Sequence, residues 1–384
     1  MGEQIIFNVS ESTTDGTYNV TIWVPNPTDS NPKSPTSWVS KGPVPRTVPT
    51  GKQAAPGFFF DETSDLLLMS LWSFKGQAGG DATPFYAARI SSHLGLIDSV
   101  ELPVKDTFGA VYIGGLVVTS SNGCDIIKNV TPDYMQRSVD NSYWIRQPNG
   151  SAWYEITITP STTPGSKKGP LAAVNGQLIC PTAMFPNFNY VHYLSLRSLH
   201  EVTFRYFWLD SFQPQYLPTS SGGNAYCTRT QVLLPENANP NFWDSDFYPM
   251  GSLVTSNNNS NTYLLYMFWA CDLTSGIGYY YVQLESDGSL NTSTDTIQAQ
   301  GYATVPGTSK MDANWFNVVQ AMGRVFCFWS SGSKCLGLSS SIASDGTIKG
   351  DWTWVQGPTT GPATKGVFSC VSVPKPWYTM PSGL

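Results

Sequence analysis

The sequence predicts an all-β protein, a six-bladed β-propeller with four-stranded blades that forms a single domain over residues 1–384. Three observations predict this class. Gly (34) and Pro (28) are plentiful, and Ser, Thr and Asn fill the gaps between short apolar runs, as in many short strands joined by turns. Apolar residues alternate or form short runs, with no convincing long amphipathic helix. A pattern of strands also recurs along the chain at the spacing of propeller blades.

The most visible part of this repeat is an apolar run that ends in Trp. HYLSLRS (192–198) has the same pattern but carries Arg197 at the Trp position. Each run is typical of a strand that is buried on both faces. The three runs with Trp are DLLLMSLWSFKG (65–76), TYLLYMFWACD (262–272) and GRVFCFWSSG (323–332).

Two further strands are expected after each of these runs. A turn leads to the first of them, and a tight turn then leads to the second. The tight turn is plainest in ESDGS (285–289) and ASDGT (343–347), where Asp-Gly supplies the positive φ that such turns need. The final strand is seen in SAWYEITITP (151–160) and KGDWTWVQ (349–356).

A smaller, Gly-rich strand precedes each unit. These first strands begin near residues 56, 110, 170, 250, 315 and 366. The gaps between them are about 54, 60, 80, 65 and 51 residues, the scale of one four-stranded blade with its loops. The second of these units, around GCDIIKNVTPDYMQ (123–136), fits the repeat least well.

The sixth unit is expected to combine both ends of the chain. KGVFSCVSV (365–373) is a first strand with no complete unit after it, whereas EQIIFNVSES (3–12) and TYNVTIWVPN (17–26) are strands with no first strand before them. We therefore predict one blade closed jointly by the N- and C-terminal strands, an arrangement that pairs edges otherwise left open.

Most of the aromatic residues are predicted to form the core. Aromatics make up 13% of the chain while charged residues make up only 12%, about half of the roughly 25% usual in soluble domains. Blades that pack face to face bury both faces of each sheet. We therefore expect most residues of the runs 58–60, 263–268 and 326–328 to be buried.

Two similar loop segments, NPNFWDSDFYPMG (239–251) and MDANWFNVVQAMG (311–323), combine Trp with short polar side chains. An indole face covers the apolar C–H side of a pyranose, and carboxylates and amides bind its hydroxyls. The alternative is that the tryptophans pack between blades and the aspartates cap turns. The predicted ligand-binding residues of these segments are Trp243, Asp244, Asp246, Asp312, Asn314 and Trp315.

A second set of candidate ligand-binding residues ends the apolar run of four units: Trp72, Trp269, Trp329 and Arg197. A residue repeated at one place in several blades indicates either repeated packing or repeated binding pockets. Three further arginines, Arg89, Arg146 and Arg205, either bind a sugar or pair with acidic side chains.

The motifs of the common catalytic classes are missing from the sequence. It contains no nucleophile elbow, P-loop, dinucleotide fingerprint or His-Glu-x-x-His. His192, Ser195 and His200 are close in sequence, but a structural role is favoured for such histidines. Carboxylates that converge on a central channel, drawn from Asp61, Asp244, Asp246 and Asp312, are the alternative that would support glycoside hydrolysis.

Charge and cysteine content narrow the partners and the location. A net charge of −6 argues against nucleic acid, and no apolar stretch has the length of a membrane span. Seven cysteines without a Cys-x-x-Cys predict reduced thiols and no metal site, with a Cys327–Cys335 pair as an alternative; we expect no cofactor. MGEQIIFNVSES at the start lacks the features of a secretory signal, which predicts a cytoplasmic protein; a secreted mature form is the alternative.

In length, low charge, SDG turns and Trp-rich repeats the chain resembles, in architecture, the six-bladed propeller lectins of fungi, such as the fucose-binding and tectonin-like groups. The resemblance implies a cytosolic lectin without catalysis, with several related pockets for glycans or glycoconjugates in clefts between blades. The repeated Arg, Glu and aromatic set of the fucose-binding group is not reproduced blade by blade, so no residue is carried over. A propeller glycoside hydrolase or lyase that uses channel carboxylates is the alternative function.

Overall fold

The described residues of the computed structural model are β-strands and turns, with one short 3-10 helix, η1 (Pro214–Tyr216). None of these residues forms a helix of the length and apolarity needed to cross a bilayer. The described ranges are 3–12, 18–26, 28–29, 37–48, 53–61, 64–74, 85–102, 116–119, 124–128, 142–147, 152–161, 173–179, 188–197, 206–233, 250–271, 276–291, 299–304, 312–331, 334–359 and 367–374.

The chain divides into two compact units. Residues 1–111, 314–341 and 351–384 form the first unit, and residues 112–313 and 342–350 form the second. The prediction of a single domain remains a prediction. Each unit is built from the four-stranded blades of a β-propeller.

Three four-stranded sheets make up the first unit, and their orders are β24-β1-β2-β3, β4-β5-β6-β7 and β20-β21-β22-β23. The strands are β1 (Glu3–Ser12), β2 (Tyr18–Pro25), β3 (Trp38–Val48), β4 (Gln53–Asp61), β5 (Leu66–Phe74), β6 (Phe85–Ile90), β7 (Leu96–Leu102), β20 (Asp312–Ala321), β21 (Arg324–Ser331), β22 (Lys334–Ser341), β23 (Thr353–Thr359) and β24 (Val367–Pro374).

The second unit holds a four-stranded sheet, β16-β17-β18-β19, and an eight-stranded sheet of order β12-β13-β14-β15-β11-β10-β9-β8. Its strands are β8 (Leu116–Thr119), β9 (Asp125–Lys128), β10 (Ser142–Arg146), β11 (Tyr154–Pro160), β12 (Ala173–Ile179), β13 (Val191–Arg197), β14 (Tyr206–Phe212), β15 (Asn224–Leu233), β16 (Met250–Asn257), β17 (Thr262–Cys271), β18 (Gly276–Leu284) and β19 (Ala299–Thr304).

The prediction of six separate blades is corrected to five sheets. The cause is a parallel pairing of β11 with β15, from Thr157 opposite Asn224 to Pro160 opposite Cys227. This pairing joins two meanders of four consecutive strands into one sheet. It satisfies the backbone groups on two strand edges that would otherwise face water.

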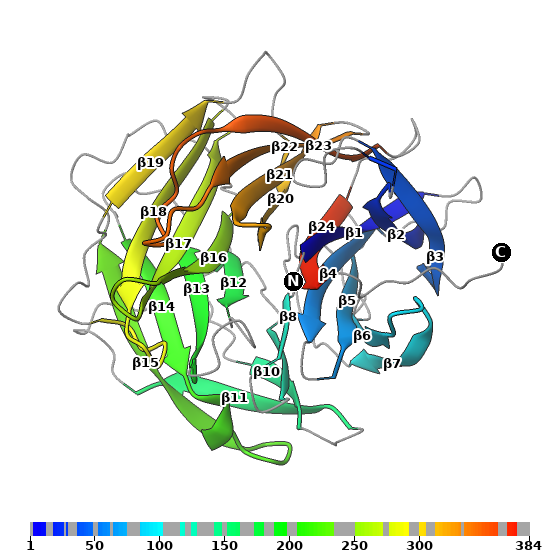
Figure 1. The fold of residues 1–384 in the computed structure, drawn as a ribbon. Coiled ribbons are helices and arrows are strands. Elements are labelled where there is room, and N and C mark those ends of the chain that lie inside the picture. Colours follow the sequence, from blue (N-terminus) through cyan, green and yellow to red (C-terminus); the bar gives the residue numbers. More distant parts are fainter. Residues whose placement is uncertain are drawn as a thin grey trace. The chain divides into compact units, whose positions relative to one another are not determined.

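The predicted positions of the first strands are confirmed. These strands are β4, β8, β12, β16, β20 and β24, and they begin within six residues of the expected places. In the first unit β24 packs beside β4, and in the second β12 packs beside β8 and β16. The joint closure by both chain ends is also confirmed, because β24 pairs antiparallel with β1 from Glu3 opposite Pro374 to Ser10 opposite Val367 (Figure 1, red and dark blue).

Both faces of the sheet that contains β1 are apolar and buried. Ile5, Phe7 and Val9 point to one side, where Phe7 lies edge-on to Phe328 with ring centroids 4.8 Å apart. Ile6 points to the other side, into a cluster that contains residues of β4 and β5. Successive side chains of a strand point to opposite faces, so the apolar residues of β1 supply both faces of the sheet. Each fully buried large apolar side chain contributes about 1.5–3 kcal/mol to the free energy of folding.

Most residues of the three aromatic runs are core residues, as predicted, while Phe59 is only partly buried. Every residue from Tyr263 to Phe268 in β17 is buried, and so are Phe326 and Phe328 in β21. Phe58 and Phe60 of β4 are buried as well. The aromatic excess of the sequence is thus mainly used for packing between sheets.

The Asp-Gly turns adopt the predicted positive φ and also dock on a neighbouring sheet. Gly288 has a φ of 85°, and a Cβ there would lie 2.7 Å from the Phe188 ring. Asn189 N donates to Asp287 O at 2.9 Å. His192 Nε2 lies 2.8 Å from Gly288 O and donates to it. Only glycine fits this close approach.

The second Asp-Gly turn lies in the segment Ile342–Gly350 and repeats this docking. Gly346 has a φ of 82°, and a Cβ there would lie 2.7 Å from Ser256 O. Its carbonyl accepts a hydrogen bond from Thr255 Oγ1 at 2.8 Å, and Tyr266 OH accepts one from Ile348 N at 3.2 Å. The same sequence motif therefore has the same packing role twice in the second unit.

His192 is a structural histidine. Its Nε2 donates to Gly288 O, so its Nδ1 accepts from Ser211 Oγ at 2.8 Å. Complete burial lowers the pKa of His192 to about 4, although Gly288 O and the nearby Asp287 oppose this shift. The folded state therefore holds the neutral imidazole, which is the form with both hydrogen bonds satisfied.

We expect His192 to make the fold acid-sensitive. Because its folded pKa lies below the unfolded value of about 6.5, its contribution is complete above that pH and is lost as the pH falls towards 4, to the extent of about 3 kcal/mol. Denaturant unfolding at several pH values should show a steeper loss for the wild type than for His192→Gln. Equal slopes for the two proteins would contradict this account.

Phe7→Ala should lower the free energy of unfolding by about 3–5 kcal/mol, because it opens a cavity at the sheet that joins the two chain ends. Ile97→Ala is the matched control, since Ile97 is 54% exposed and should cost little. Guanidinium unfolding of both variants measures the difference. A Phe7 variant as stable as the control would show that this closure is not needed.

Candidate functional site

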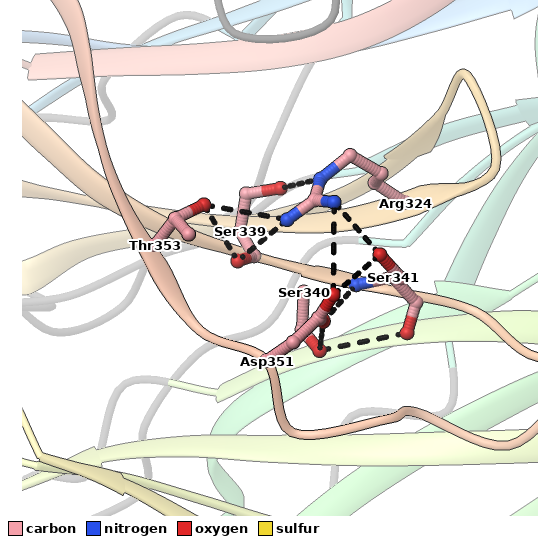
Figure 2. A network of polar contacts seen from close by, with 6 residues as sticks. All are labelled: Arg324, Ser339, Ser340, Ser341, Asp351 and Thr353. Atoms are coloured by element: carbon pink, nitrogen blue, oxygen red, sulfur yellow. Dashed lines mark hydrogen bonds and ion pairs between the residues drawn. The ribbon is translucent and has the colours of Figure 1, made fainter.

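Polar side chains gather at one end of the sheet β20–β23. We call this the hairpin end, because the turns between β20 and β21 and between β22 and β23 lie there. We call the opposite end of a sheet its crossover end. Arg324 opens β21 and lies opposite Ser341, the last residue of β22. Asp351 and Thr353 follow on the way into β23, and Figure 2 shows their side chains converging on Arg324 and Ser341.

A tight turn brings Arg324 to this position. Met322 and Gly323 have φ values of 54° and 69°, as in the two-residue turns that suit the twist of a β-hairpin. The strand β21 therefore starts directly at Arg324. Its backbone is fixed in the sheet while its long side chain extends over the end of β22.

Arg324 is held by four hydrogen bonds. Its Nε donates to Ser339 Oγ at 2.7 Å, and its Nη1 donates to Ser341 Oγ at 2.7 Å. Its Nη2 donates to Ser339 O at 3.1 Å and to Thr353 Oγ1 at 3.3 Å. The guanidinium group is thus fixed before any ligand arrives.

Asp351 is held as firmly from the other side. Its Oδ1 accepts from Ser341 N at 2.6 Å and from Ser340 Oγ at 2.8 Å, and its Oδ2 accepts from Ser341 Oγ at 2.7 Å. These bonds to Ser341, with the charge of Arg324, lower the pKa of Asp351 to about 2. The carboxylate is therefore ionised at any pH at which the fold is expected to persist.

The cluster is net neutral and open to solvent. Arg324 Nη1 and Asp351 Oδ2 lie 4.0 Å apart, with side-chain exposures of 19% and 51%. Ser341 Oγ accepts from the first and donates to the second. Fixed donors and acceptors side by side, with no net charge, match the hydroxyl groups of a neutral ligand better than an anion or a cation.

The eight-stranded sheet carries a charged pair at the corresponding place. Arg146 ends β10 and lies opposite Asp125, the first residue of β9, and its guanidinium group donates to Asp125 Oδ2. Both side chains are buried, and the guanidinium lies 5.5 Å from the centroid of the Trp153 ring. Arg146 therefore has the ion-pair role that was one of its two predicted alternatives.

The structure leaves the first set of predicted ligand-binding residues only partly located. Trp243, Asp244 and Asp246 lie outside the described residues. Asp312, Asn314 and Trp315 are at the start of β20, which is at the crossover end of the sheet. They are therefore at the opposite end of this sheet from Arg324.

The second predicted set also lies towards crossover ends. Trp269 lies opposite Met250 and Arg197 lies opposite Ala173, and Met250 and Ala173 are the first residues of the first strands β16 and β12. Trp72 is opposite Ala55, near the start of β4. The register thus places these three backbone positions at the same end of their sheets.

Trp329, the fourth member, is fully buried. Its ring packs edge-on against Trp354, with centroids 5.8 Å apart. It has the packing role that was the alternative to ligand binding, and it offers no exposed face to a sugar. Asp61, one of the predicted channel carboxylates, is also buried and accepts a hydrogen bond from Ser64 Oγ.

The sequence did not predict the Arg324 cluster. The available signal was a two-residue Met-Gly turn directly before Arg324, which fixes the register of the hairpin that follows. Strand β21 starts at Arg324 and pairs with β22 from Ser331 opposite Lys334. This register places Arg324 opposite Ser341. The docked turn Ile342–Gly350 then returns Asp351 to the same place, which a local pattern does not predict.

Cys124, Cys327, Cys335 and Cys370 are buried thiols that form no disulfide. Cys327 lies opposite Leu338 and Cys335 opposite Ser330, so the alternative disulfide between them is not formed. Burial raises the pKa of both thiols. Within the described ranges, no three His, Cys, Asp or Glu side chains are grouped so that they could hold a metal ion.

Ser341→Ala should raise the pKa of Asp351 from about 2 towards its ordinary value of 3.8, because the Ser341 hydroxyl donates to the carboxylate. An NMR titration of the side-chain carboxyl carbons measures this directly. Ser344→Ala, on the exposed turn, is the control and should leave the value unchanged. Identical titrations for both variants would contradict the hydrogen-bond network.

No family model matches the chain, and no curated protein matches it. Among solved structures it is similar to NanB in complex with optactamide, at 9% identity and a TM-score of 0.46, over 77% of this chain and 59% of that one. It is also similar to a GH43 β-1,3-galactosidase, at 10% identity and a TM-score of 0.39, over 95% of this chain and 78% of that one. A third similar structure is apo AztD from Citrobacter koseri, at 10% identity and a TM-score of 0.30, over 97% of this chain and 98% of that one. Likeness at this level assigns neither a family nor an activity to the chain.

Proposed function

We propose that this protein is a carbohydrate-binding β-propeller lectin that binds glycans at more than one site and does not catalyse a reaction. The observation that carries the proposal is the Arg324–Ser341–Asp351 cluster. It holds an ionised carboxylate and a guanidinium group in fixed, partly exposed positions with no net charge. Sugar hydroxyls both donate and accept, so they can use both groups at once.

The crossover ends are the second part of the proposal. Asp312, Asn314 and Trp315 combine an indole with short polar side chains at the start of β20. Trp243, Asp244 and Asp246 repeat this composition shortly before β16 begins at Met250. With Trp72, Trp269 and Arg197, they form a set of related glycan sites, each weak alone and more effective when several of them bind one multivalent ligand.

The chemistry of Asp351 favours binding over hydrolysis. A glycosidase needs a general acid whose pKa is raised and a second carboxylate about 5–9.5 Å away. The pKa of Asp351 is instead lowered to about 2, so this carboxyl cannot donate a proton near neutral pH. The alternative of a hydrolase or lyase therefore depends on other carboxylates, such as Asp244 and Asp312.

Two finer statements belong to the same proposal. One is the likeness to the fungal, cytosolic type of propeller lectin, with glycans or glycoconjugates as partners. The other is a cytoplasmic location. The first rests on low charge, SDG turns and Trp-rich repeats, and the second on seven cysteines without a Cys-x-x-Cys, which predict reduced thiols.

A glycan array probed with the wild type and with Asp351→Asn tests the proposal. The substitution keeps the shape of the side chain and removes its charge, so binding at this site should weaken about ten-fold, or about 1.4 kcal/mol. Lys349→Ala is the matched control, because Lys349 is exposed and lies two residues away. A wild type that binds no glycan, or an Asp351→Asn protein with full binding, would contradict the proposal for this cluster.

The same array separates the other sites and the alternative function. Trp243→Ala and Trp315→Ala should each weaken binding without abolishing it and leave the melting temperature nearly unchanged. If they instead lower stability and retain full binding, these residues have packing roles. Turnover of chromogenic glycosides or polysaccharides that is abolished by Asp244→Asn or Asp312→Asn would establish the hydrolase.

A further inference from the structure

A second polar and aromatic surface lies on the outward face of the joined strands β11 and β15. Tyr226 of β15 is 71% exposed. Its neighbours along the strand, Ala225 and Cys227, are buried in a core cluster of the second unit. The alternation of the strand therefore points Tyr226 to solvent, with the exposed Asn224 and Thr228 on the same face.

The partner strand adds hydroxyl groups to the same face. Thr157 lies opposite Asn224, and Thr159 lies opposite Tyr226. Ile156 and Ile158, which alternate with them, are buried in the same core cluster. The outward face thus presents one phenol ring bordered by threonine hydroxyls and an asparagine amide.

The surface is rigid because its backbone is fixed on both sides. Thr157 N donates to Gly223 O at 3.2 Å, Gly222 N donates to Glu155 O at 3.1 Å, and Ser161 N donates to Cys227 O at 2.8 Å. These bonds continue the parallel ladder at both of its ends. A ligand would therefore meet side chains whose backbone positions are already fixed by the sheet.

The charges on this surface indicate the class of ligand. Arg229 is the cation of β15, and its guanidinium group donates to both carboxylate oxygens of Asp210, each at 2.7 Å. Its charge is therefore paired with an acidic side chain of this chain. The charged side chain of β11 is Glu155, which is exposed and would repel an anion. A flat aromatic ring among neutral hydroxyl and amide groups matches an uncharged, C–H-rich and hydroxylated ligand.

We infer that Tyr226, with Thr157, Thr159 and Asn224, is a binding platform for neutral pyranose units of a polysaccharide. The phenol ring covers the C–H face of one sugar, and the polar side chains bind its hydroxyls. The inference rests on the proposed carbohydrate-binding function but names a site distinct from the Arg324 cluster and from the crossover ends. An open, one-sided contact of this kind is weak alone and is suited to repeated units.

Affinity electrophoresis in gels that contain a neutral β-glucan, mannan or galactan tests this platform. Tyr226→Ala should weaken retardation by the bound polysaccharide about ten-fold, or about 1.4 kcal/mol, whereas Tyr226→Trp should keep it. Thr157→Val, which removes one hydroxyl, should weaken it less. Tyr216→Ala is the matched control, because Tyr216 is 75% exposed but lies on η1. All four variants should melt as the wild type does, since these side chains are exposed.

The outcomes separate this platform from the other sites. If Tyr226→Ala binds as the wild type does while Asp351→Asn loses binding, the platform is wrong and the proposed function stands. If Tyr226→Ala loses binding and Asp351→Asn keeps it, the platform is supported and the Arg324 cluster is not a glycan site. A wild type retarded by no neutral polysaccharide, or only by an anionic one, would overturn the platform.

Discussion

The sheet that contains β1 has two apolar faces, and both are buried. In the sheet that contains β1, Phe7 faces one neighbour and Ile6 faces the other. A sheet with two apolar faces needs a packing partner on each side. The pairing of β24 with β1 meets this requirement for the two chain ends, because neither end alone provides a complete sheet.

This constraint determines which residues remain for binding. Most of the aromatic side chains that the structure describes are buried, and Tyr266 and Trp329 are among them. Side chains are accessible where the sheets end and where an outer strand faces solvent. The Arg324 cluster occupies the first kind of place and Tyr226 the second. Both rest on backbone that is hydrogen-bonded in a sheet, which fixes their geometry before a ligand binds.

The strand pattern and the closure were predictable because both depend on local sequence. Alternating and continuous apolar runs mark strands, and the missing first strand at the N-terminus matches the spare one at the C-terminus. The parallel pairing of β11 with β15 was not predictable, since its register depends on how two meanders meet. The Arg324 cluster was missed because Ser341 and Asp351 reach Arg324 only through a hairpin and a docked turn. Trp329 shows a second reason. The same apolar run that ends in Trp suits packing or binding, and only the burial of the Trp side chain in the structure decides between the two roles.

The central claim is that the protein binds neutral glycans and leaves them unchanged. Mass spectrometry after incubation of the immobilised wild type with a mixed pool of neutral oligosaccharides at pH 7 tests it most directly. The account predicts that a subset of the pool is retained and that the summed bound and unbound fractions have the starting composition. Retention of no oligosaccharide, or the appearance of shortened products, would contradict it.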